Sequence, residues 1–126
     1  MALPARIPKP LKRSKRWRSA AHCNFVRQHG CSIPGCVGRP IEVAHVRFGS
    51  GAGMAQKPSD DRTVSLCREH HQVQHTIGEP AFWARYKLVA QQDVEQLIAE
   101  FCAASPKAAE IARVKRERAA SMENEL

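Results

Sequence analysis

The stretch Cys67-Arg-Glu-His-His-Gln-Val-Gln-His75 is the densest run of potential metal ligands in the chain. We expect a helix over it, with Cys67 and His70 (i, i+3) on one face and His71 and His75 (i, i+4) on another. Each residue turns a helix by about 100°, so His70 and His71 point in different directions and do not easily serve one ion. The stretch therefore predicts the junction of two metal sites. The site of Cys67 and His70 is completed by cysteines elsewhere in the chain, and the site of His71 and His75 keeps open positions for catalysis.

A second motif, Cys31-Ser-Ile-Pro-Gly-Cys36, supplies the missing cysteines. Its central Pro-Gly pair can turn the chain tightly enough for two thiolates to converge on one ion. Together with Cys67 and His70 these residues make a Cys₃His set, which is typical of a closed, tetrahedral structural zinc site. The alternative is a pair of reduced cysteines without a metal.

The composition favours a small protein that binds a polyanion. The chain has 126 residues, about one domain, and 20 Lys and Arg against 12 Asp and Glu give a net charge of +8. Binding to a membrane surface and simple solubility are the alternatives. We find no apolar stretch long enough to span a membrane and no apolar core of a secretory signal at the N-terminus. Cysteines grouped with histidines favour metal ligation over disulfides, so we expect a reducing compartment such as the cytoplasm.

The charge distribution divides the chain into three parts. Residues 1–20 are rich in basic residues and proline, which predicts a flexible arm. Residues 21–88 contain the metal motifs and form the predicted domain, and residues 89–126 form a helical extension. The arm is expected to contact DNA phosphates or to be only a solvated tail. Its candidate contacts are Lys12, Arg13, Lys15, Arg16 and Arg18.

Periodicity predicts an α+β fold in which a hairpin leads into the metal-binding helix. Helices are expected over 17–28, from 67 to near 78, over 93–102 with Asp93 as cap, and from 108 to about 122, with further helical spacing at 82–86. Strands are expected over 41–47 and 63–66, joined by a long loop. The first strand puts Ile41, Val43, His45 and Arg47 on one face. His45 near its end is predicted to leave the core for a cleft, although a structural histidine is the alternative.

These motifs together resemble the HNH, or ββα-metal, endonuclease superfamily. Within it, the chain looks most like the phage recombination-enhancement nucleases over roughly residues 22–86. The residues that carry this resemblance are Ala44-His45-Val46-Arg47, Gly51-Ala52-Gly53-Met54, Lys57-Pro58-Ser59-Asp60, the run from Leu66 to His71, and His75, Gly78, Phe82 and Trp83.

The resemblance implies a role for each matching residue. His45 would be the general base that takes a proton from the attacking water. His71 and His75 would hold one catalytic divalent cation, which could be magnesium, manganese or zinc. Arg47 or Lys57 could hold a neighbouring phosphate. The expected products carry 5′-phosphate and 3′-hydroxyl ends.

The chain departs from the superfamily pattern at two positions. Many members have a histidine or aspartate before the base as a third metal ligand, but here the residue is Ala44, which leaves two protein ligands. The central asparagine is also absent, and Asp60 or Asp61 is its expected replacement. We favour Asp60, which lies in the matching Lys-Pro-Ser-Asp run.

The sequence therefore predicts a metal-dependent DNA endonuclease. The alternative is a zinc-stabilised DNA-binding or adaptor module without catalysis, and a structural protein with two zinc sites is a third possibility. A pure binding module needs only the Cys₃His site and has no need for the three imidazoles of His45, His71 and His75. The phage resemblance further implies a bacterial or phage-encoded protein of the cytoplasm and a partner of the RecA-filament type.

Overall fold

The computed structural model describes residues 16–50 and 57–124. The predicted arm contacts Lys12, Arg13 and Lys15 and the loop motif at 51–54 lie outside the described residues. Within the described part, two strands and five helices follow in the order α1 (Ala20–Arg27), β1 (Ile41–His45), β2 (Thr63–Cys67), α2 (Arg68–Ile77), α3 (Glu79–Ala90), α4 (Val94–Ala104) and α5 (Ala108–Asn124). The predicted mixed α+β class is confirmed. None of the described helices is long and apolar enough to cross a membrane.

The two strands form an antiparallel hairpin that fixes the positions of the predicted site residues. Ile41 pairs with Cys67, and His45 pairs with Thr63. His45 and Cys67 therefore lie at opposite ends of the ladder. The chain passes directly from Cys67 into α2, and the Cys67 thiol accepts from the backbone N–H of His70 as the helix cap. Local capping therefore holds this cysteine and this histidine together.

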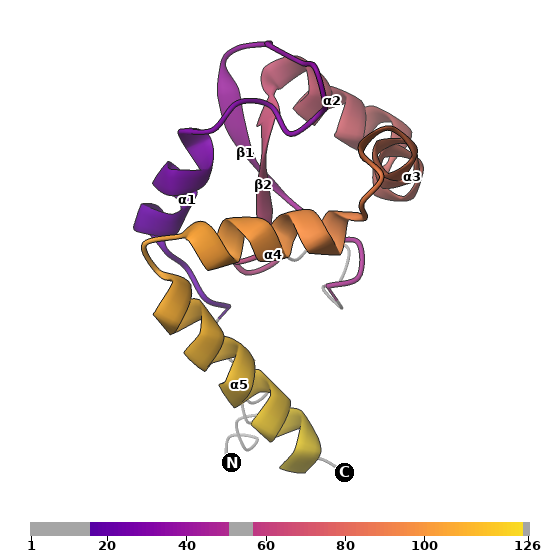
Figure 1. Ribbon diagram of the computed structural model, residues 1–126. Helices are drawn as coiled ribbons and strands as arrows, with labels where there is room; N and C mark the ends of the chain where they lie inside the picture. Colours follow the sequence, from indigo (N-terminus) through magenta and orange to yellow (C-terminus); the bar gives the residue numbers. More distant parts are fainter. Residues whose placement is uncertain (1–15, 51–56, 125–126) are drawn as a thin grey trace, which may run out of the picture.

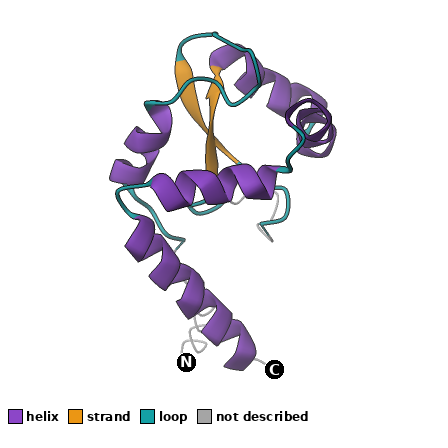
Figure 2. Cartoon of the chain, viewed as in Figure 1, coloured by secondary structure: helices purple, strands orange, loops and turns teal. Residues whose placement is uncertain are grey.

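Helices cover the hairpin on several sides. Figures 1 and 2 show α1 on one side of the strands, α2 and α3 on the other, and α4 crossing the strands. Every residue of β2 is buried, and Val64 and Leu66 pack in one apolar cluster with Leu97 and Ile98 of α4. The predicted cap is present, because Asp93 and Gln96 form a capping box at the start of α4. The division of the chain at residue 88 stays a prediction.

Two element boundaries differ from the predicted ones for identifiable reasons. The helix expected from residue 17 begins at Ala20, because the Ser19 hydroxyl caps it. The indole of Trp17 instead donates to Glu110 of α5 at 3.0 Å. The strand expected to reach residue 47 ends at His45. Beyond it the partner segment turns, because the backbone N–H of Arg62 donates to the carbonyl of Ser59, and the N–H of Arg47 donates to the carboxylate of Glu79 at 3.0 and 3.1 Å.

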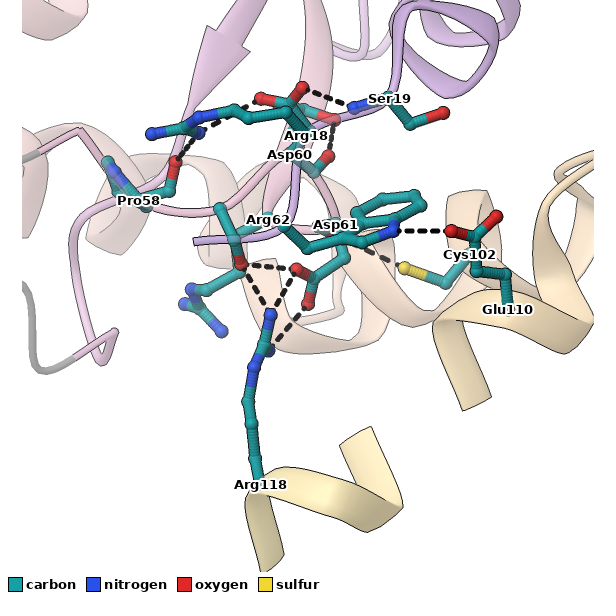
Figure 3. Close-up of polar contacts among 12 residues, drawn as sticks. Arg18, Ser19, Pro58, Asp60, Asp61, Arg62, Cys102, Glu110 and Arg118 are labelled. Carbon is teal, nitrogen blue, oxygen red and sulfur yellow. Dashed lines mark hydrogen bonds and ion pairs between the residues drawn. The ribbon is translucent and has the colours of Figure 1, made fainter. Parts of the chain in front are cut away.

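The C-terminal helix α5 extends away from the hairpin but is anchored to the loop before β2 (Figure 3). Arg118 donates to both carboxylate oxygens of Asp61, at 3.0 and 3.2 Å, and the Cys102 thiol donates to the Asp61 carbonyl. Burial opposes ionisation of Asp61, but the hydrogen bonds from Arg118 and Ser59 prevail and lower its pKa. Arg118 of the helical extension is thus committed to an ion pair with the predicted domain.

Candidate active site and metal cluster

The three cysteines and the histidine of the predicted zinc set converge in the structure. The Nδ1 atom of His70 lies 3.5 Å from Cys31 Sγ, 3.4 Å from Cys36 Sγ and 3.2 Å from Cys67 Sγ. The sulfurs of Cys36 and Cys67 are 3.9 Å apart. All four ligand atoms lie within 4.8 Å of one another. The cluster joins the 31–36 turn to the first turn of α2.

These distances are compatible with zinc. Bond lengths of about 2.3 Å for Zn–S and about 2.0–2.1 Å for Zn–N put the ligand atoms of a tetrahedral site roughly 3.5–3.8 Å apart. Gly38 closes the cluster, because a Cβ there would lie 3.0 Å from Cys67 Sγ. Its backbone N–H also donates to Cys36 Sγ at 3.4 Å, as suits a thiolate. The cluster therefore fits a closed, structural zinc ion.

The other pair of helical histidines forms a second, open group. The Nε2 atoms of His71 and His75 lie 3.2 Å apart. The Nδ1 atom of His71 lies 3.0 Å from Glu42 Oε1, on strand β1. Hydrogen bonds from His71 and Arg68 lower the pKa of Glu42, so its carboxylate accepts and His71 Nδ1 carries the proton. His71 then presents the lone pair of Nε2 beside His75, as a metal ligand requires.

His45 lies next to this group and is held by the carboxylate of Asp60. Its Nε2 atom is 2.8 Å from Asp60 Oδ1. Asp60 also accepts from the Ser19 backbone N–H at 2.9 Å and from the Arg18 guanidinium at 3.1 Å (Figure 3). Burial opposes ionisation of Asp60, but these hydrogen bonds prevail and lower its pKa. Of the two aspartates considered, Asp60 contacts His45, and Asp61 pairs with Arg118.

The ionised state of Asp60 decides the tautomer of His45. A carboxylate can only accept, so His45 Nε2 must donate and carry the ring proton. The lone pair of a neutral His45 is then on Nδ1, which makes no hydrogen bond within the described residues. Burial lowers the pKa of His45 below its ordinary value, although the Asp60 hydrogen bond partly opposes this. A neutral imidazole with a free Nδ1 can take a proton.

Arg18 has a different environment from the one expected for a residue of a flexible arm. Its guanidinium pairs with Asp60 and donates to the carbonyls of Lys57 and Pro58 (Figure 3). These contacts tie the start of α1 to the loop that carries Asp60. Arg16, also expected in the arm, is half-buried at the start of the described chain. A contact of either residue with DNA stays a prediction.

A hollow of about 500 Å³ opens over these residues. His45, His71 and His75 line it together with both predicted phosphate ligands, Arg47 and Lys57. The structure thus brings the predicted base, the predicted ion ligands and the predicted phosphate ligands to one surface.

Glu79 also lines this hollow and was not singled out in the sequence. Its carboxylate accepts from the backbone N–H of Arg47, the amide of Gln74 at 3.3 Å and the indole of Trp83 at 3.2 Å. The Glu79 carboxylate therefore connects the segment that follows His45, at the end of β1, to α2 and α3. Glu42 was missed in the same way. In the predicted first strand, alternation places Glu42 on the face opposite His45, and nothing local marks Glu79.

An antiparallel hairpin followed by a helix, with a zinc-compatible cluster at the junction and three histidines around a hollow, defines a small ββα-metal protein. The chain belongs to the HNH nuclease family described as "Putative HNHc nuclease", whose family model matches residues 5–103. Neither the curated proteins nor the solved structures gave a significant match.

Proposed function

We propose that this protein is a metal-dependent DNA endonuclease that hydrolyses phosphodiester bonds in the hollow between β1 and α2. The observation that carries the proposal is the contact of His45 Nε2 with the ionised Asp60, which leaves Nδ1 as a base beside the His71 and His75 pair. Membership of the HNH nuclease family supports the same reaction.

His45 acts as the general base in this mechanism. Its Nδ1 takes a proton from a water molecule as the water oxygen attacks the phosphorus. The bond from phosphorus to the 3′ oxygen then breaks, and that oxygen takes a proton from solvent. The products carry 5′-phosphate and 3′-hydroxyl ends. Asp60 keeps the imidazole oriented and keeps the proton on Nε2, while Arg47 and Lys57 attract, by charge, phosphates next to the one that is cut.

The proposed ligands of the catalytic ion are His71 and His75, with Glu42 holding His71. A magnesium, manganese or zinc ion bound there would supply Lewis-acid stabilisation of the negative charge that develops during hydrolysis. Zinc in the Cys₃His cluster would have no catalytic part, because four protein ligands leave no open position. In this proposal the His71 and His75 pair serves catalysis, and the Cys₃His cluster stabilises the fold.

The test is cleavage of supercoiled, linear and single-stranded DNA with magnesium, manganese or zinc. We expect the wild-type protein to cut with at least one ion and the His45→Ala variant to cut about 10³-fold more slowly with that ion. Tight DNA binding without cutting in any condition, by protein shown to be folded and zinc-loaded, would contradict the proposal and favour a DNA-binding module. The resemblance to phage recombination-enhancement nucleases supports adding a RecA-type filament as a further condition.

Cleavage should decrease in acid with the titration of His45. Burial lowers the pKa of its imidazole below 6.5, with Lys57 adding to the decrease and Asp60 opposing it. Only the neutral ring accepts a proton, so kcat/KM should be at its plateau at neutral pH and should fall as the pH decreases through that lowered pKa. Initial rates measured between about pH 5 and pH 8 check this. An apparent pKa above 7 would contradict it.

Removing Glu42 should weaken the binding of the catalytic ion. Partners that orient a ligating histidine typically contribute 10-fold to 100-fold in metal affinity, so Glu42→Ala should raise the Kd for manganese by about that factor. Titration calorimetry on zinc-loaded protein measures this without reference to activity. The matched control is Glu100→Ala, which removes an exposed carboxylate from α4. Equal affinities of the two variants would contradict the assigned role of Glu42.

A further inference from the structure

The hollow over the candidate site continues on the other side of His45. A second hollow of about 450 Å³ shares Val43, His45, Lys57 and His71 with the first. The first extends from these residues toward Arg47 and Glu79, and the second extends toward Cys23 and Arg27 of α1. The two hollows therefore form one groove that passes across His45. A DNA strand whose phosphodiester lies at His45 has room to continue in both directions.

The carboxylates of the second hollow are already occupied by partners. Asp60 pairs with Arg18 and His45, and Glu42 pairs with Arg68 and His71. Their negative charge is therefore compensated by these groups. Neither carboxylate forms an ion pair with the other cations that line this hollow, Arg27 and Lys57.

Two cations in the same hollow have no acidic partner. Arg27 donates only to the neutral side-chain amide oxygen of Asn24, at 2.7 Å, and it forms no ion pair within residues 16–50 and 57–124. Lys57 likewise forms no ion pair with any carboxylate in those ranges. Both side chains belong to exposed residues, so they are accessible from the groove. The hollow thus presents two uncompensated positive charges beside the candidate site.

Arg27 of α1 and Lys57 of the loop before β2 both lie close enough to Cys23 to affect its thiol electrostatically. Burial raises the pKa of the Cys23 thiol to about 11, Asp60 adds to the increase, and Arg27 and Lys57 each oppose it. The same half-buried thiol therefore lies in the field of both cations. An anion above Cys23 would be attracted from the α1 side by Arg27 and from the loop side by Lys57.

We propose that Arg27, together with Lys57, forms a binding site for a backbone phosphate of the DNA strand, on the α1 side of the phosphodiester that is cut. This inference rests on the proposed nuclease function and adds a residue to it. A guanidinium can hold a phosphate through two parallel N–H donors, and the ammonium adds a point charge. Such a site orients the strand across His45 without reading its sequence.

The experiment compares Arg27→Gln with the wild type on two substrates. An oligonucleotide has neighbouring phosphates, whereas bis(p-nitrophenyl) phosphate has a single phosphodiester. We expect the ratio of kcat/KM for the oligonucleotide to that for the small substrate to fall about tenfold in Arg27→Gln, as for the loss of one charged hydrogen bond. The matched control is Arg85→Gln. Arg85 lines a different hollow with His70, Val73 and Ile77, on another face of α2.

A binding measurement keeps the test independent of catalysis. In the His45→Ala background, the slope of log K against log salt for the oligonucleotide should decrease by about one in Arg27→Gln and should not change in Arg85→Gln. Identical ratios and identical salt slopes for the two arginine variants would overturn the phosphate site. If the wild type cuts neither substrate with any ion, the proposed nuclease function fails, and the salt slope still decides whether Arg27 contacts DNA.

Discussion

His45→Ala is expected to lower the rate of DNA cleavage by about 10³-fold while the protein stays folded and keeps its zinc. General base catalysis is typically worth 10²-fold to 10⁴-fold, and no other imidazole of the site has the same contact with a carboxylate and the same free Nδ1. Asp60 keeps the Ser19 N–H and Arg18 as partners after the substitution, so no buried charge is left unpaired. Single-turnover cleavage, zinc content and thermal unfolding measure the three parts of this prediction.

The matched control is His29→Ala, which removes an exposed imidazole at the end of α1. His29 packs on Phe25 and Phe101 and does not line the hollow over His45. We expect this variant to cut DNA at the wild-type rate. Cleavage by His45→Ala at a rate within a few-fold of the His29 variant would show that another group is the base.

Cys36→Ala is expected to lose zinc and to unfold the domain. Structural zinc contributes on the order of 10 kcal/mol in small zinc-binding peptides. That is comparable to the whole stability of a small domain, about 5–15 kcal/mol. Cys36 is one of the four proposed zinc ligands, and the cluster ties the 31–36 turn to the end of β2 and to α2, which also carries the proposed ion ligands His71 and His75. Zinc content by metal analysis and unfolding by circular dichroism measure the result.

Cys23→Ala is the matched control, because Cys23 is a free thiol outside the cluster. It should keep one zinc per chain and a Tm near that of the wild type. The comparison of Cys36→Ala with His45→Ala separates the two sites. An equal loss of folding in both variants would contradict the division between a structural and a catalytic group.

Much of the fold and of both ligand groups could be predicted because the signals are local. The cap of α2 places Cys67 with His70, and helical geometry places His71 with His75, whatever the rest of the chain does. The capping box of Asp93 and the stop of α2 before Gly78 are equally local. The predicted start of α1 was wrong by three residues, because the Ser19 hydroxyl caps the helix at Ala20 and Trp17 before it contacts Glu110, 93 positions away.

The tertiary structure alone decided how the acidic and basic side chains are paired. Asp60 and Asp61 are neighbours with the same chemistry, yet the first holds His45 and the second holds Arg118, 57 positions away. The partners of Glu42 and Glu79 are also set by tertiary packing, of α2 against β1 for Glu42 and of α3 against the segment after β1 for Glu79.

By itself, then, the sequence determined the class of fold, the Cys₃His set and the histidine pair, since these follow from spacing along one helix and one turn. The structure decided which carboxylate contacts His45, which tautomer this imidazole has, and that Arg27 and Lys57 have no acidic partner among the described residues. Those pairings depend on charged side chains that come into contact only when distant segments pack together. The periodicity of the sequence therefore does not predict them.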